Sequence, residues 1–168
     1  MTALGAIVLL AVACAAPPPS TAPPPSNPTP VAGAETPAPG AVTVLTTPWL
    51  PPWSGPATPP EIAERAGLRF CGVEQGPGPV DLAIRRCFVD SVTSGQDIEF
   101  ARIEPTTEGD PIATVYGFEP PDGYVILYDS TQDAFGARGW QVTTCASIVA
   151  DAVEVFRYEG CEEGPLFR

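Results

Sequence analysis

Proline is concentrated in one stretch of this chain, and that stretch limits where a folded core can form. Between Pro17 and Pro60, sixteen of forty-four residues are proline, and most of the others are Ala, Ser, Thr or Gly. Such a segment has too few large apolar side chains for a core and favours extended polyproline conformations. The sequence therefore predicts a disordered stalk over residues 14–60 and one small domain over residues 61–168.

Two tryptophans stand near the end of the proline-rich stretch. In "PWLPPWSGPATPP", Trp49 and Trp53 are the only large aromatic side chains. Aromatic and proline residues together can form a ligand for a partner that recognises polyproline helices. The alternative is that both indoles pack on the folded domain, and we expect this second arrangement because it buries large apolar surfaces.

The chain begins with an apolar run that is too short to cross a membrane. Ala3–Ala13 supplies eleven nearly continuous apolar residues, whereas a spanning helix needs about 20. That length is typical of an export signal, and Ala11-Val12-Ala13 has the small-x-small pattern of a cleavage site. The sequence therefore predicts a signal peptide over residues 1–13.

The five residues that end this run resemble the lipobox of bacterial lipoproteins. They read Leu10-Ala11-Val12-Ala13-Cys14. The resemblance implies that Cys14 carries diacylglyceryl and palmitate groups and anchors the protein to the outer face of the bacterial cell membrane. Two signals or chains are needed for stable anchoring, because a single chain binds only marginally. Ordinary secretion after cleavage within "AVACAA" is the alternative.

Four cysteines remain once Cys14 is assigned to the lipid. Four cysteines allow three disulfide connectivities, which the sequence alone does not decide. They form two pairs with sixteen-residue spacings, Cys71 with Cys87 and Cys145 with Cys161, and local pairing is the simplest expectation. A zinc site would need closer C-x₂₋₄-C spacings, which do not occur. Two disulfides indicate an oxidising compartment.

The distribution of charge excludes some classes of partner. Residues 61–168 hold all eight basic residues, which are arginines, and nineteen of the twenty acidic residues, so their formal charge is −11. Nucleic acids and anionic lipid headgroups both need a basic surface. We therefore expect no nucleic-acid partner and a membrane contact that runs through Cys14. A monomer is also expected, with an envelope protein or the cell wall as its other partner.

Local patterns predict one main helix followed by strands. Pro79 suits a first helical turn, Gly95 suits a helix end, and apolar residues between them recur at helical spacing. Asp81 and Arg85 stand four apart, as a solvent-facing pair would. A shorter helix is expected in "PPEIAERAG". Five runs rich in β-branched and aromatic residues follow: residues 96–103, 111–118, 124–129, 140–149 and 153–158. The sequence predicts an α+β domain with one helix packed on a four- or five-stranded antiparallel meander.

Most catalytic chemistry is missing from this composition. The chain has no histidine, so serine–histidine and cysteine–histidine nucleophiles are excluded. "GVEQGPGP" lacks the lysine of a phosphate-binding loop. "DSTQDAFG" lacks the remaining ligands of an EF-hand loop. The sequence therefore predicts no cofactor, and we expect a protein that is not an enzyme.

One cluster of carboxylates is the candidate site. If a hairpin turns on Pro120–Gly123, facing positions sum to about 243, so Asp110 lies opposite Asp133, with Glu108 and Asp129 as neighbours. Clustered carboxylates repel one another unless something compensates their charge. They bind a hard cation such as Ca²⁺, act as general acid and base in hydrolysis, or accept backbone N–H groups and fix the turns. The last interpretation is favoured.

The motifs "TTEGDPI" and "DSTQDAFG", followed by the Cys145–Cys161 pair, also resemble an uncharacterised family of small bacterial lipoproteins, defined as a domain of unknown function. The resemblance covers about Phe70 to Cys161 and implies a lipid-anchored extracytoplasmic protein, with no activity or catalytic residues to transfer. We expect a non-enzymatic binding module of the cell envelope. A carboxylate- or metal-dependent envelope hydrolase and a structural or folding-accessory protein are the alternatives.

Overall fold

The computed structural model describes residues 38, 40–65, 67–152 and 155–167 of the 168-residue chain. The expected signal peptide, Cys14 and the stalk as far as residue 37 lie outside these residues. Within the described part of the chain, no helix is long and apolar enough to span a membrane.

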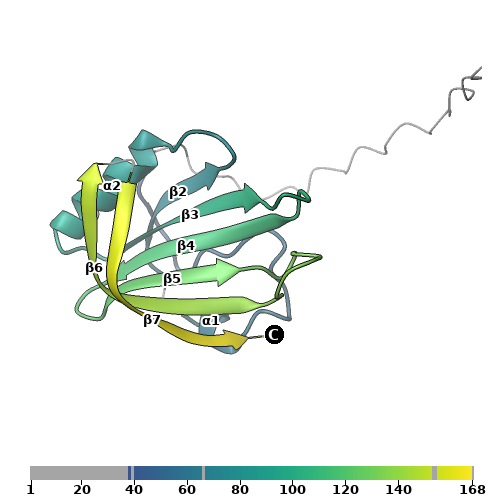
Figure 1. Cartoon of the computed structure of the whole chain (residues 1–168). Helices are drawn as coiled ribbons and strands as arrows, with labels where there is room; N and C mark the ends of the chain where they lie inside the picture. The colour runs from purple at the N-terminus through teal and green to yellow at the C-terminus, as the bar shows by residue number, and fades with distance from the viewer. Residues whose placement is uncertain (1–37, 39, 66, 153–154, 168) are drawn as a thin grey trace, which may run out of the picture. The chain divides into compact units, whose positions relative to one another are not determined.

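A seven-stranded sheet organises the domain, and its strands lie side by side in chain order (Figure 1). Its strands are β1 (Thr43–Val44), β2 (Arg69–Gln75), β3 (Ile98–Pro105), β4 (Pro111–Glu119), β5 (Gly123–Asp129), β6 (Trp140–Ala152) and β7 (Val155–Phe167). Neighbouring strands are antiparallel except β2 and β3, which are parallel. Two helices complete the domain, α1 (Pro60–Ala63) and α2 (Leu82–Thr93).

This architecture corrects the expected fold class. One helix on a four- or five-stranded antiparallel meander is wrong, because the sheet is mixed and has seven strands. The sequence patterns missed two strands, the two-residue β1 and the seven-residue β2, and for β2 the reason is physical. Its buried residues run consecutively from Phe70 to Gly72, because both faces of the strand are covered. A strand buried on both faces has no alternating pattern, and its parallel pairing with β3 requires a crossover, which α2 provides.

Helix α2 lies within the expected range of residues 79–95 and ends as expected. Asp81 is its N-cap, and its carboxylate accepts the N–H groups of Ala83 and Ile84 at 2.9 and 3.3 Å. Gly95 follows the helix with a φ of +67°. The expected solvent-facing pair of Asp81 and Arg85 is wrong, because Asp81 caps the helix and Arg85 is buried against Glu74.

Each face of the sheet carries its own hydrophobic core. Under α2 the core consists of Cys71, Ile84, Phe88, Ile98 and Phe100. The far parts of β6 and β7 curve so that they lie beside α2 (Figure 1), and Ile148 and Phe156 pack against this core. Phe88 meets the Phe100 ring edge-on at 5.0 Å. The helix and the curved hairpin therefore cover one face together.

The proline-rich segment covers the other face. Its core consists of Ile62, Phe70, Ala101, Val115, Leu127 and Trp140, with Leu45, Trp49 and Leu50 among the residues packed against it. Trp49 stacks on Phe70 with ring centroids 5.7 Å apart. The described residues from Gly40 to Pro60 thus lie on the domain, although the composition favoured a stalk ending at Pro60. Proline suits this irregular cover because it has no N–H that needs a partner.

Both disulfides of the domain join the cysteine pairs favoured by their spacing. Cys71 of β2 bonds to Cys87 of α2, and Cys145 of β6 bonds to its cross-strand partner Cys161 of β7. The first bond ties the helix to the sheet, and the second fixes the register of the last hairpin. The presence of two disulfides indicates an oxidising, extracytoplasmic environment.

Candidate functional site in the acidic loops and the adjacent cavity

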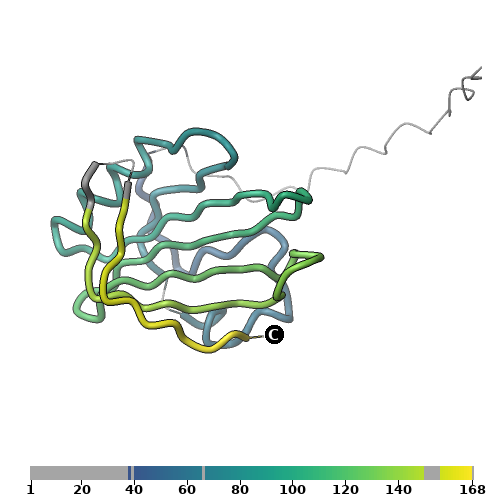
Figure 2. The backbone as a smooth tube through the Cα atoms, in the orientation of Figure 1, coloured from purple at the N-terminus to yellow at the C-terminus, as the bar shows by residue number. Residues whose placement is uncertain are grey.

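The hairpin of β4 and β5 brings the two acidic loops together. Ala113 pairs with Asp129 and Glu119 with Gly123, so the register continues to Asp110 opposite Gln132. The expected partner, Asp133, lies one residue farther along. Figure 2 shows the β3–β4 and β5–β6 loops at the same end of the sheet. The turn at Pro120–Gly123 therefore fixes the meeting of the two motifs to within one residue.

Asp110 joins the two loops. Its Oδ2 accepts the backbone N–H of Ala134 at 2.9 Å. Within its own loop, the N–H of Asp110 donates to the Thr106 hydroxyl, and the Asp110 carbonyl accepts the N–H of Thr106 at 2.8 Å. This carboxylate therefore holds residues 130–139, the β5–β6 loop, against the β3–β4 loop.

Asp133 shapes the β5–β6 loop from inside. Its Oδ1 accepts the N–H groups of Phe135 and Gly136 at 2.9 and 2.7 Å. Its carbonyl oxygen accepts the Nε–H of Arg138 at 2.6 Å. Because the two N–H groups stabilise the charged form, the pKa of the Asp133 carboxyl is lowered from its ordinary value. This carboxylate is kept ionised and held in a tight turn.

Asp129 connects the sheet to the proline-rich cover. Its side chain is buried, and its Oδ2 accepts the Nε1–H of Trp53 at 2.9 Å, while Oδ1 accepts the N–H of Thr131 at 2.9 Å. Glu108 is exposed in the β3–β4 loop. In the described residues, no three His, Cys, Asp or Glu side chains are arranged as metal ligands. The observed bonds are those of carboxylates that fix turns.

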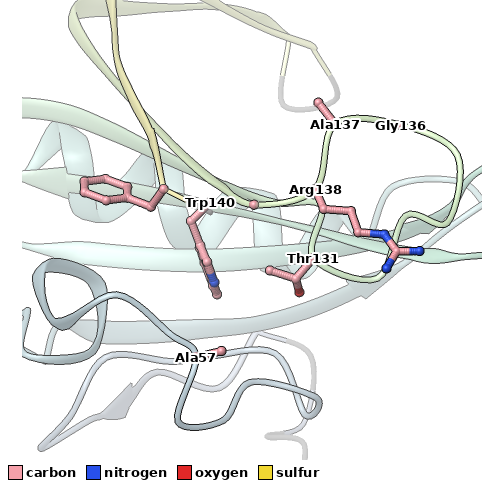
Figure 3. A pocket seen from close by; sticks show the side chains of 8 residues that line it. Ala57, Thr131, Gly136, Ala137, Arg138 and Trp140 are labelled. Atoms are coloured by element: carbon pink, nitrogen blue, oxygen red, sulfur yellow. The ribbon is translucent and has the colours of Figure 1, made fainter.

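An open cavity of about 580 Å³ lies beside the β5–β6 loop (Figure 3). Ala57 of the proline-rich segment lines it from one side, and Phe167 of β7 also faces it. The loop contributes Thr131 and the run from Gly136 to Gly139, and Trp140 begins β6. Figure 3 shows the Trp140 indole and the Thr131 side chain on the side of Ala57, with the Arg138 guanidinium at the margin.

The aspartates predicted as site residues therefore build the walls of this cavity. Asp133 shapes the loop that lines it, Asp110 anchors that loop, and Asp129 holds Trp53, four residues before Ala57. The residues that line the cavity were not predicted from the sequence. Ala57, Ala137 and Phe167 carry no local signal of a site, because their proximity depends on the sheet bringing three distant segments together.

Two further buried glutamates neutralise arginines elsewhere in the domain. The Glu74 carboxylate accepts Nε–H and Nη2–H of Arg85 at 2.6 and 2.7 Å, and Arg102 reaches it at 3.1 Å. Glu99 has an exposed fraction of 0% and accepts from Arg65 at 2.7 Å and from the Trp49 N–H at 3.0 Å. Burial raises the pKa of the Glu99 carboxyl, and Arg65 opposes this rise.

Comparisons with protein-family models, curated proteins and solved structures find no match to this chain. The geometry of the loops and of the cavity is therefore the basis for assigning a function. That geometry combines an open cavity, walls held by carboxylates that accept N–H groups, and a cover of proline-rich chain.

Proposed function

We propose that this protein is a non-enzymatic binding module of the bacterial envelope, tethered by a lipid on Cys14, with its ligand in the cavity beside the β5–β6 loop. The single observation that carries the proposal is that the three aspartates predicted as site residues hold the walls of the cavity. Asp110, Asp129 and Asp133 accept backbone or indole N–H groups and hold the cavity walls. Their arrangement supports a preformed binding site.

The state of these carboxylates favours binding over hydrolysis. A general acid in a glycosidase needs a raised pKa, whereas the pKa of Asp133 is lowered by its N–H donors. Both carboxylate oxygens of Asp129 already accept hydrogen bonds, from the Trp53 indole and from the Thr131 N–H. The proline-rich segment outside the described residues adds to the proposal, because an extended tether from Cys14 would give the module reach from the membrane.

The cavity suggests the chemistry of its ligand. A volume of about 580 Å³ falls within the range of small-molecule sites, which are mostly apolar with a few placed polar groups. Phe167 supplies apolar surface, the Thr131 hydroxyl supplies a hydrogen-bonding group, and Arg138 supplies a positive charge at the margin. Trp140 also lines the cavity but belongs to the core and is only 2% exposed. A small envelope component with an apolar or flat ring and an acidic group, such as a muropeptide fragment, fits this lining.

The test fills the cavity and leaves the rest of the domain intact. Ala137→Trp places a large side chain in the cavity, and Ala63→Trp is the matched control on an exposed residue of α1 outside its lining. Soluble muropeptides and a library of small acidic ring compounds would be titrated while the Trp140 indole N–H resonance is followed. We expect shifts in the wild type and in Ala63→Trp that disappear in Ala137→Trp. Shifts that persist in Ala137→Trp, or no shift at Trp140 with any compound, would refute the proposal.

A further inference from the structure

The last strand leaves one edge of the sheet open. Strand β7 is the final strand in the order, and within the described residues no strand pairs with its outer side. It is thirteen residues long, and residues 159–166 are all exposed. An edge of this length presents backbone N–H and C=O groups that can pair with an added strand. The opposite edge is shorter, because β1 has two residues.

The register shows which backbone groups face outward. Cys145 and Cys161 are directly opposed, with Cα atoms 4.0 Å apart. Directly opposed antiparallel residues lie close to 4.5 Å apart when they do not exchange hydrogen bonds with each other. The N–H and C=O of Cys161 therefore point away from β6. The register is continuous from Ser147↔Glu159 to Thr143↔Glu163, so Glu159 and Glu163 also direct their backbone groups outward.

An acidic groove accompanies this edge. It has a volume of about 410 Å³, and its apolar lining includes Ile62, Leu127, Val142 and Phe167. Four glutamates line it as well, and these are Glu61, Glu119, Glu162 and Glu163. Such a groove suits a lysine or arginine side chain, whose aliphatic stem lies on apolar surface while its charge meets carboxylates.

Arg65 is the one basic residue among those that line the groove. Its Nη atoms are already engaged by Glu99 and Glu119 at 2.7 and 3.4 Å. Its side chain is 10% exposed, and its buried Nε has no hydrogen-bond partner among the described residues. A buried donor without a partner is costly.

We infer that β7 and the adjacent groove form a docking site for an extended, basic segment of another protein, which adds as a strand beside β7. The free edge supplies main-chain hydrogen bonds, and the glutamates select positively charged side chains. Pairing of two copies through β7 is disfavoured, because it would set Glu159 and Glu163 of one copy near those of the other. The inference does not depend on the cavity beside the β5–β6 loop.

The test uses the full mature chain with both disulfides intact and a fluorescent peptide that alternates lysine with threonine or valine over ten residues. We expect binding that weakens as salt is added. Glu162→Gln/Glu163→Gln should weaken it about fivefold, the effect of losing two exposed charge pairs. Asp90→Asn/Asp97→Asn, at exposed positions in α2 and before β3, makes the same change in net charge and should leave the affinity unchanged.

Backbone pairing has its own readouts in the unaltered protein. The peptide should slow hydrogen exchange of the Glu159, Cys161 and Glu163 amides, and the same peptide with alternate amides N-methylated should bind at least tenfold more weakly. Equal binding of the methylated peptide, unchanged exchange in β7, or equal losses in the two double variants would overturn the inference. So would a peptide-insensitive dimer, detected by analytical ultracentrifugation, whose interface protects the same amides.

Discussion

Arg65→Met would leave a fully buried carboxylate without its cation. Glu99 has an exposed fraction of 0%, and the Arg65 guanidinium donates to its Oε2 at 2.7 Å. Methionine retains most of the aliphatic length of arginine and removes the charge. The one remaining donor to Glu99 among the observed contacts is the Trp49 N–H, at 3.0 Å. The variant therefore removes the ion pair with Glu99 under the proline-rich cover, together with the longer Arg65–Glu119 contact of 3.4 Å.

The size of the effect follows from the burial of the pair. Removing one partner of a buried ion pair typically destabilises a protein by about 3–5 kcal/mol, because the other charge stays buried and uncompensated. Small domains have total stabilities of about 5–15 kcal/mol. A loss of about 3 kcal/mol would lower the Tm of a domain of this size by about 10 °C. Arg65→Met/Glu99→Gln removes both charges and should recover much of this loss.

The pH dependence gives the prediction its sharpest form. Burial raises the pKa of Glu99 in the folded protein, so the folded state holds its proton more tightly than the unfolded state. The stability contributed by that proton is complete below the ordinary pKa of 4.5 and is lost as the pH rises through the folded value. Arg65 lowers the pKa of Glu99, so its removal raises that pKa further and extends the pH range over which the folded protein binds the extra proton. Arg65→Met should therefore be nearly neutral at pH 4 and strongly destabilised at pH 7.

Thermal unfolding of the oxidised protein, followed by circular dichroism between pH 4 and pH 7.5, measures this difference. Arg86→Met, which removes an exposed arginine of α2, is the matched control and should follow the wild type. A destabilisation of Arg65→Met that is equal at pH 4 and pH 7 would mean that lost packing, and not the buried charge, governs the effect. A loss below about 1 kcal/mol at pH 7 would refute the electrostatic argument altogether.

Two further substitutions test the contacts that organise the site. Trp53→Phe removes the indole donor from buried Asp129 and should lower the free energy of unfolding by about 2 kcal/mol. Hydrogen exchange in residues 45–65 should increase, and unchanged exchange there would contradict the role of this bond. Asp133→Asn removes a carboxyl whose folded pKa is lowered, so its stabilisation is present above the ordinary pKa of 3.8 and is lost as the pH falls through the folded value. The wild type should therefore lose more stability than Asp133→Asn between pH 5 and pH 2 in thermal unfolding, and parallel profiles would exclude a contribution from Asp133.

The candidate site shows how far a local register can be extrapolated. The Pro-Asp-Gly turn predicted a hairpin, and counting outward from it placed Asp110 near Asp133 with an error of one residue. The same counting gave no information about the partners of these side chains. Trp53 reaches Asp129 across 76 positions of sequence, and contacts at that separation depend on how the chain packs, which no local pattern encodes. The cavity was missed for this reason.

The sequence by itself determined the features that short-range chemistry controls. These are the end of α2 before Gly95, the strands from β3 to β6, and the cysteine pairs sixteen residues apart. Each depends on neighbouring residues or on a single turn, so spacing and residue type are sufficient.

Only the tertiary structure decided what covers the sheet. Strand β2 lacked an alternating pattern because both of its faces are buried, and its parallel pairing with β3 leaves no turn signal. The described proline-rich residues were assigned by composition to a stalk, yet they lie on the domain. The packing of Trp49 and Trp53 on the domain was predicted and is confirmed, but their partners, the Phe70 ring and the buried Asp129 carboxylate, were not predicted. Arg85 was assigned to the solvent-facing side because it stands four residues after Asp81 in the sequence, and it is instead buried and paired with Glu74. In each case the deciding interaction joins segments distant in sequence, and its energy exists only once the whole fold brings them together.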